Sequence, residues 1–159
     1  MPQWFSPAGL LVAVLQQIPG IVWALRPPPD DPFAQNSGTA LVEVLEKTFG
    51  IGTLLLVVVV LASVPVPSVV TRLCLAGSFF VLAAYYAFYV QYFRGLTAWP
   101  ILLGMAAFPP LSFVLIAISQ GNWPATVSGI VFGIVHVGLT YKNLGPGAKQ
   151  DSRQTARVS

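Results

Sequence analysis

The sequence predicts an all-α protein: a polytopic bundle of five membrane-spanning helices, or four if the first segment does not cross. Two observations indicate this class. Only 8% of the residues are charged and 55% are hydrophobic, whereas a soluble domain carries about 25% charged residues. Apolar segments of about 20 residues also recur along the chain, and this length crosses a bilayer. We therefore expect an integral membrane protein whose first partner is the lipid bilayer.

The net charge of +3 does not indicate a nucleic-acid partner. Basic residues stand at the ends of the apolar segments, and four of the eight lie in the last 18 residues, which is the distribution that membrane topology produces. Cys74 is the only cysteine, so an internal disulfide and a cysteine metal cluster are excluded. The sequence has no glycine-rich phosphate loop and no zinc-binding histidine motif, so we predict neither a cofactor nor a metal.

The first segment, residues 6–25, has no basic region before it and no small-residue cleavage site after it. We expect a retained helix and not a cleaved signal peptide. Gln16 stands near its centre, where an amide needs a hydrogen bond from another helix or from a ligand. Pro19 and Gly20 interrupt the run, so a helix lying on the membrane surface is the alternative to a span.

Prolines crowd the next stretch, residues 24–38, and predict an extended loop. Asp30 and Asp31 lie in this loop, and we interpret them as solvated because no histidine or further acid stands near them at metal-ligand spacing. The helix that follows is expected to run unbroken to Val64, with residues 48–64 as the second span.

This second helix carries a polar stripe that descends from the headgroups into the lipid. Its members, spaced three or four residues apart, are Glu43, Glu46, Gly50 and Thr53. The third span, residues 73–93, lies between two arginines and holds Tyr85 and Tyr89 at a depth where each hydroxyl needs a partner.

The fourth span, residues 98–119, contains two consecutive prolines near its middle, Pro109 and Pro110. Each proline lacks an N–H, so together they free the backbone carbonyls of Met105 and Ala106. Free carbonyls are costly against lipid. The kink should therefore face protein or a water-lined pocket.

The fifth span, residues 123–141, carries a small residue at every fourth position: Ala125, Gly129 and Gly133. Such a ridge is typical of close helix docking in membranes. His136, the only histidine, lies on nearly the same face. We expect one transmembrane domain over residues 1–142 and a disordered basic cytosolic tail over residues 143–159.

The positive-inside rule predicts which side faces the cytosol. With five spans and the N-terminus outside, every basic residue except Arg72 falls on the inside. This predicts a multi-pass protein of the plasma membrane or an internal membrane with a cytosolic C-terminus. At 1.5 Å per residue, Thr53, Tyr89 and His136 lie ~8–9 Å below the cytosolic boundary, with Glu43 and Glu46 just above them.

An ionisable residue inside a membrane span is a functional hypothesis by default. For His136 the alternative is a structural hydrogen bond to a tyrosine or to a carbonyl that the prolines free. The first hypothesis is a protein that binds or transforms a lipophilic small molecule (sterol-, isoprenoid- or polyketide-like) near the cytosolic leaflet. Imidazole exchanges protons near neutral pH, so the enzyme would be an isomerase or cyclase without a redox cofactor. The expected catalytic residues are His136, Glu46 and Glu43, and the expected ligand contacts are Tyr85, Tyr89, Thr53 and Gln16.

Two other hypotheses remain open. A non-enzymatic assembly subunit would use the ridge of Ala125, Gly129 and Gly133 to dock a second copy or another membrane protein. A small proton-coupled transporter is the weaker alternative, because transporters usually carry a carboxylate within a span and an internal repeat. This sequence places its glutamates at the surface and has no visible repeat.

Overall fold

The computed structural model describes residues 4–28, 32 and 40–145 of the chain, which form five helices. These are α1 (Pro7–Leu25), α2 (Ala40–Val58), α3 (Ser68–Phe93), α4 (Trp99–Ser119) and α5 (Trp123–Leu144). Over the described residues the only β contacts are two isolated bridges, so the predicted all-α class is confirmed. The expectations for Asp30, Asp31 and residues 146–159 fall outside the described residues.

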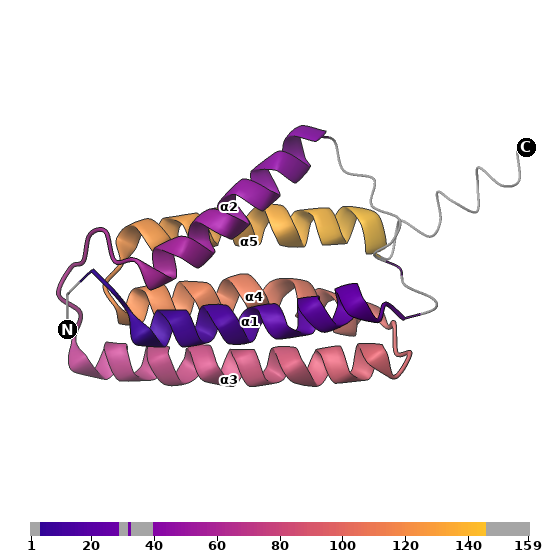
Figure 1. Cartoon of the computed structure of the whole chain (residues 1–159), viewed down its shortest axis with the longest axis horizontal. Helices are drawn as coiled ribbons and strands as arrows, with labels where there is room; N and C mark the ends of the chain where they lie inside the picture. The colour runs from indigo at the N-terminus through magenta and orange to yellow at the C-terminus, as the bar shows by residue number, and fades with distance from the viewer. Residues whose placement is uncertain (1–3, 29–31, 33–39, 146–159) are drawn as a thin grey trace, which may run out of the picture.

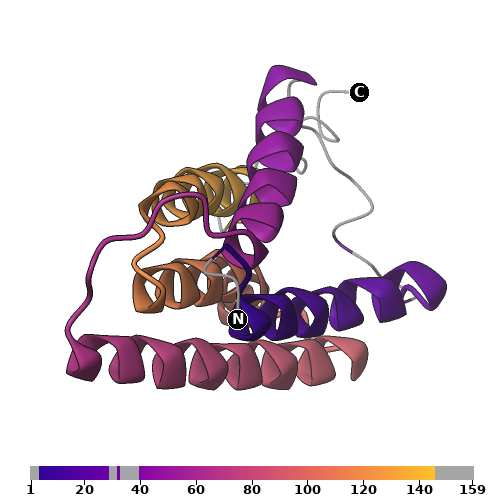
Figure 2. The same ribbon diagram turned by 60° about the vertical axis from the view of Figure 1, so that its left-hand side comes forward.

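Helices α1, α3, α4 and α5 lie side by side; α1, α3 and α5 run in the same direction, and α4 runs opposite to them (Figure 1). Helix α2 is tilted across them. Its C-terminal end touches the bundle, whereas its N-terminal end points away from α1, as the turned view shows (Figure 2). The arrangement is a four-helix bundle with a fifth helix that diverges from it.

Four of the described helices are long and apolar enough to cross a membrane: α1, α3, α4 and α5. Helix α4 has the highest mean hydropathy, 2.3, and 56% of its most apolar window is buried, against 17–28% for the other three. A helix that is apolar on every side is buried among neighbours. Helix α4 is accordingly the centre of the bundle.

Large apolar side chains cover the outside of the bundle. Leu25, Phe80 and Ile134 are 70–77% exposed, and many other leucines, isoleucines and valines are also exposed. A water-soluble protein rarely presents an apolar surface of this extent. The surface and the four long apolar helices are consistent with an integral membrane protein.

Helix α2 departs from the expected second span. The first segment, which the sequence left in doubt, is long and apolar enough to cross, whereas α2 does not qualify because Glu43, Glu46 and Lys47 lie within its 19 residues. The expected end at Val64 is also wrong, since the helix ends at Val58.

The early end of α2 has a backbone cause. The amide of Val60 donates to the carbonyl of Trp4 at 2.8 Å, the amide of Val64 donates to Gly121 at 3.0 Å, and Val59 pairs with Phe5 in one of the isolated bridges. Valines favour extended backbone because branching at Cβ restricts their rotamers in a helix. The valine run therefore leaves the helix once extended partners are within reach.

A polar cluster fastens this end of α2 to the bundle. Gln120 donates to the hydroxyl of Ser6 at 2.8 Å and to the carbonyl of Val57 at 3.2 Å, and Asn122 donates to the carbonyl of Leu56 at 2.6 Å. These bonds join the start of α1, the end of α2 and the turn between α4 and α5. Gly9 of α1 packs directly on the Val57 carbonyl, where a Cβ would collide.

The small-residue ridge of α5 is used inside the chain. A Cβ on Gly129 would lie 3.0 Å from the Val114 side chain of α4, and one on Gly133 would lie 3.2 Å from Pro110. Ala125 is fully buried. The ridge therefore lets α5 approach α4 closely, as small residues do in membrane helix pairs. Helix α5 also continues three residues beyond the expected end at 141, to Leu144.

Candidate functional site

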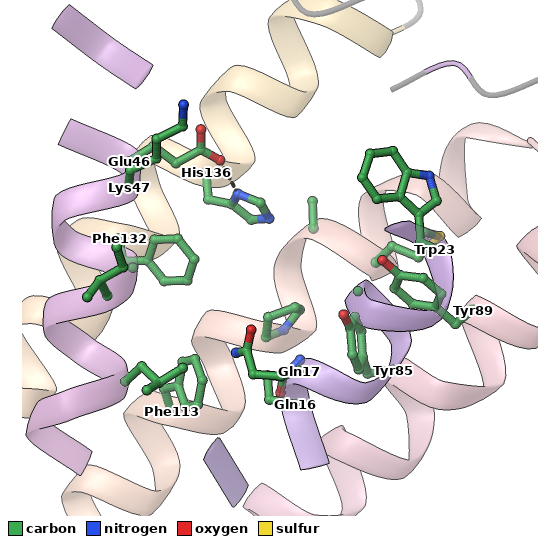
Figure 3. Close-up of a pocket in the computed structure, with 17 residues that line it drawn as sticks. Gln16, Gln17, Trp23, Glu46, Lys47, Tyr85, Tyr89, Phe113, Phe132 and His136 are labelled. Atoms are coloured by element: carbon green, nitrogen blue, oxygen red, sulfur yellow. Dashed lines mark hydrogen bonds and ion pairs between the residues drawn. The ribbon is translucent and has the colours of Figure 1, made fainter. Parts of the chain in front are cut away.

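The divergence of α2 leaves a cleft of about 500 Å³ that all five helices line. Its walls are mostly apolar and aromatic, with polar groups at a few points (Figure 3). Pockets that bind small molecules have this size and this mixture. The polar side chains of the lining are Gln16, Gln17, Glu46, Lys47, Tyr85, Tyr89 and His136.

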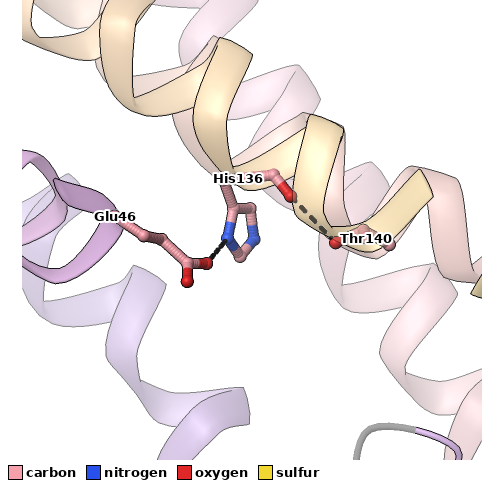
Figure 4. Close-up of polar contacts among 3 residues, drawn as sticks. All are labelled: Glu46, His136 and Thr140. Atoms are coloured by element: carbon pink, nitrogen blue, oxygen red, sulfur yellow. Dashed lines mark hydrogen bonds and ion pairs between the residues drawn. The ribbon is translucent and has the colours of Figure 1, made fainter. Parts of the chain in front are cut away.

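An ion pair links the two walls of the cleft. The Nδ1 atom of His136 on α5 lies 2.5 Å from Oε1 of Glu46 on α2. Their side chains are 28% and 24% exposed respectively, so both are partly withdrawn from the surroundings. Thr140 donates to the backbone carbonyl of His136 at 3.0 Å and leaves the imidazole itself to Glu46 (Figure 4).

Two neighbours fix the orientation of the His136 ring. An ionised carboxylate only accepts hydrogen bonds, so Nδ1 carries the proton in this pair. Phe132, one turn earlier on α5, stacks on the imidazole with 5.1 Å between ring centroids. The second ring nitrogen, Nε2, then points into the cleft (Figure 3). A carboxylate bonded to one ring nitrogen fixes the tautomer and the orientation of the imidazole.

A second polar group lies deeper in the cleft, on α1. Gln16 is 5% exposed, and its Oε1 accepts a hydrogen bond from Ser112 of α4 at 3.0 Å. Its amide nitrogen, Nε2, is buried and has no hydrogen-bond partner among the described residues. The Tyr85 hydroxyl lies beside the Gln16 amide (Figure 3). An unsatisfied buried donor costs about 1–3 kcal/mol.

Two expected ligand contacts come from α3. Tyr85 is 5% exposed and meets Tyr89 edge to face, with ring centroids 5.0 Å apart. Both line the cleft on the side opposite Glu46 (Figure 3). Tyr86, which the sequence did not single out, anchors α3 to α1 by donating to the carbonyl of Leu15 at 2.7 Å.

The proline pair also borders the cleft. Helix α4 remains continuous through Pro109 and Pro110. Met105 and Ala106, whose carbonyls these prolines free, are in the lining together with Pro109. Ser112 lies 2.9 Å from the Pro109 carbonyl and within donating geometry. The prolines were expected to face protein or a pocket. Pro109 lines the cleft and Pro110 packs against Gly133 of α5, so both surroundings are present.

Some expected site residues lie elsewhere. Thr53 is fully buried and shares a 2.8 Å hydrogen bond with Ser128 of α5, so it holds α2 against α5 and does not line the cleft. Glu43 is partly buried and is also outside the lining. Ala125, Gly129 and Gly133 pack within the bundle. The structure thus brings together His136, Glu46, Gln16, Tyr85 and Tyr89, and leaves the others aside.

Sequence reasoning missed several lining residues. Phe132 precedes His136 by four residues, the spacing at which side chains meet on a helix, so a signal existed. Trp23 of α1 also lines the cleft. No pattern in the sequence pairs Ser112 with Gln16, although the two side chains share a hydrogen bond.

Within the described residues no group of three or more histidine, cysteine or acidic side chains could hold a metal ion. Comparison of the chain with known protein families, with characterised proteins and with solved structures finds no match. The site must therefore be interpreted from its own geometry.

Proposed function

We propose that this protein binds a lipophilic small molecule in the cleft and transforms it by proton transfer at His136. The observation that carries the proposal is the Glu46–His136 pair in the wall of an apolar cleft that opens beside α2. The aromatic side chains of Trp23, Tyr85 and Phe132 suit a flat or chain-like apolar skeleton. Sterol-, isoprenoid- and polyketide-like molecules belong to this class.

The chemistry follows from the orientation of the ring. Glu46 accepts the Nδ1 proton of His136 and favours the imidazolium that forms when Nε2 takes a proton. Nε2 removes a proton from one atom of the substrate and returns it to another. The substrate loses and regains one proton, so the net reaction is an isomerisation or a cyclisation and needs no electron acceptor.

We also propose that the chain crosses the membrane five times, with α2 as a tilted crossing. The ends of α1, α3 and α5 lie at the same end of the bundle (Figure 1). Arg26, Arg94 and Lys142 stand at these three ends, and Arg72 near the opposite one. The positive-inside rule then assigns the end nearest the Glu46–His136 pair to the cytosol.

The alternative functions have less support. The ridge that would dock an assembly partner is occupied by α4 and α2 of the same chain. A transporter would need a carboxylate that is exposed in turn to each side, whereas Glu46 is paired with His136. No specific observation favours either alternative over an acid–base site.

Deuterium exchange tests the proposal without knowledge of the substrate. Purified protein is incubated in D₂O with a total lipid extract of its source membrane, and the lipids are analysed by mass spectrometry. We expect at least one lipid to gain deuterium at carbon, and the rate to fall at least 100-fold with His136→Gln or Glu46→Gln, within the range that general acid–base groups supply.

Lys47→Gln is the matched control, because Lys47 adjoins Glu46 and lines the cleft but is not part of the pair. It should leave the exchange rate unchanged. Two results would contradict proton transfer as the function of this site. One is exchange that continues at the wild-type rate in folded His136→Gln and Glu46→Gln protein; the other is exchange that never exceeds the rate in lipid without protein.

A further inference from the structure

Gln16 is, together with Tyr85, the most deeply buried hydrogen-bonding side chain of the cleft lining. It is 5% exposed and borders the cleft from α1. Ser112 fixes the amide by bonding to Oε1 at 3.0 Å, and Nε2 remains without a partner among the described residues. A primary amide carries two N–H donors on this nitrogen. The bond to Ser112 uses only Oε1, so both N–H donors of Nε2 are left without an acceptor.

Buried polar groups are normally satisfied by protein, water or a ligand. Nε2 forms no hydrogen bond with the acceptors of the same lining, which include the carbonyls of Met105 and Ala106 that the prolines free. The group that completes Gln16 must accept a hydrogen bond, because the nitrogen can only donate. The molecule that carries this acceptor must also be apolar, because it fills an apolar cleft.

The acceptor should be uncharged. Lys47 is the only lysine or arginine of the described lining, and it stands beside Glu46 on α2. A carboxylate or phosphate at Gln16 would be stripped of water without a counter-ion beside it, and buried charges of this kind are strongly disfavoured. A carbonyl oxygen accepts well and costs less to desolvate.

The two polar points of the cleft are separated along the bundle axis. Gly133 of α5 faces Pro110 of α4, His136 follows three residues later, and Ser112 lies two residues along the antiparallel α4. At 1.5 Å per residue this gives an axial separation of about 7.5 Å between the levels of Ser112, which holds Gln16, and His136. A molecule held at Gln16 thus extends its skeleton towards Nε2 of His136.

We propose that the cleft selects a lipophilic carbonyl compound, a ketone or related neutral acceptor, whose oxygen binds Nε2 of Gln16. This inference rests on the proposed function and specifies its substrate class. A carbonyl also acidifies neighbouring C–H bonds, and an imidazole base requires such acidity to remove a proton from carbon. Gln16 is then the recognition residue and His136 the base.

Matched ligands that differ only in the carbonyl test the proposal. The probes are cholestanone with cholestane, and geranylacetone with the corresponding hydrocarbon. Their Kd values are measured in detergent micelles by quenching of tryptophan fluorescence, to which Trp23 in the cleft wall contributes. We expect the wild-type protein to prefer the ketone of at least one pair about tenfold, the factor that one neutral hydrogen bond supplies.

Gln16→Met should abolish this preference and still bind the hydrocarbon, because methionine fills a similar volume without a donor. Gln17→Met is the matched control, since Gln17 is the next residue, lines the same cleft and is exposed; it should keep the preference. Ser112→Ala, which frees the amide to rotate, should weaken ketone binding and serves if Gln16→Met fails to fold.

The outcomes separate the two proposals. Equal affinity for ketone and hydrocarbon in the wild-type protein, or a preference that survives Gln16→Met, would overturn the role of Gln16 and leave lipophile binding intact. Absence of binding by all four probes would contradict the proposed function, and this inference with it.

Discussion

At the scale of single residues, the site depends on one ion pair. Glu46 and His136 come from different helices, and each is the nearest charged or ionisable partner of the other among the described residues. Their contact closes α2 towards α5 at the end where the two helices otherwise diverge. The pair should therefore contribute to stability as well as to chemistry.

A double-mutant cycle measures this contribution. Each of His136→Gln and Glu46→Gln should lower the free energy of unfolding in detergent by about 1–2 kcal/mol, with a coupling energy near 1 kcal/mol, as expected for a partly buried hydrogen-bonded pair. Lys47→Gln should show no coupling to His136. Purely additive effects of the two pair substitutions would mean that the contact does not form.

The sequence identified some site residues for physical reasons and missed others. An imidazole in a span, glutamates at its level and a glutamine in the acyl core are unusual enough to be noticed. Their depth along a helix follows from counting, so His136 and Glu46 could be matched in level. Rotation about each helix axis does not follow from counting, which is why Thr53 was expected in the site but faces Ser128.

At the scale of helices, α2 distinguishes this fold from a regular bundle. Its C-terminal end is fixed by Gln120, Asn122 and the contact of Gly9 with the Val57 carbonyl. Its other end diverges from α1 (Figure 2), and residues of this half of α2, among them Glu46 and Lys47, line the cleft. The cleft is thus a consequence of unequal packing along one helix.

Gly9→Ala tests this packing. The added Cβ would fall on the Val57 carbonyl, a backbone atom that cannot rotate away, so we expect a loss of about 1–3 kcal/mol of unfolding free energy. Gly20→Ala in the same helix is the control, since its Cβ meets no atom within 4 Å, and alanine there should be neutral or stabilising by up to about 1 kcal/mol. Equal stabilities of the two variants would contradict the close approach of α1 and α2.

Helix positions could be predicted from the sequence better than the residues at which the helices end. Length and hydropathy located all five helices, but α3 begins at Ser68, five residues before the expected span, and α2 ends at Val58, six residues before its expected end. The valine run after Val58 suits a helix or an extended segment equally well, and periodicity does not separate the two. Its backbone partners, near Trp4 and Gly121, are distant in sequence. The segment therefore took the structure that those distant contacts made available.

At the scale of the whole molecule, the proposed topology has five crossings and a cytosolic C-terminus. A C-terminal green fluorescent protein fusion expressed in bacteria should fluoresce, and an alkaline phosphatase fusion at the same point should be inactive. The reason is that green fluorescent protein becomes fluorescent in the cytosol, whereas alkaline phosphatase becomes active only outside it. Active phosphatase with a dark fluorescent fusion would place the Glu46–His136 end on the other side and contradict the topology.

The central claim is that the cleft beside α2 holds a lipophile, and photolabelling of a cleft-filling variant tests it most directly. Gly20 lines the cleft and Gly138 does not; a Cβ at either position meets no atom within 4 Å. The Cβ of Gly20→Leu or Gly138→Leu therefore meets no clash, and of the two glycines only Gly20 lines the cleft. Labelling by diazirine-bearing sterol and polyprenyl probes is mapped by mass spectrometry.

We expect the label on peptides of the cleft walls in the wild-type protein and in Gly138→Leu, and at least a fivefold loss with Gly20→Leu. Equal labelling of both variants, or label confined to the outer surface of the bundle, would contradict the account.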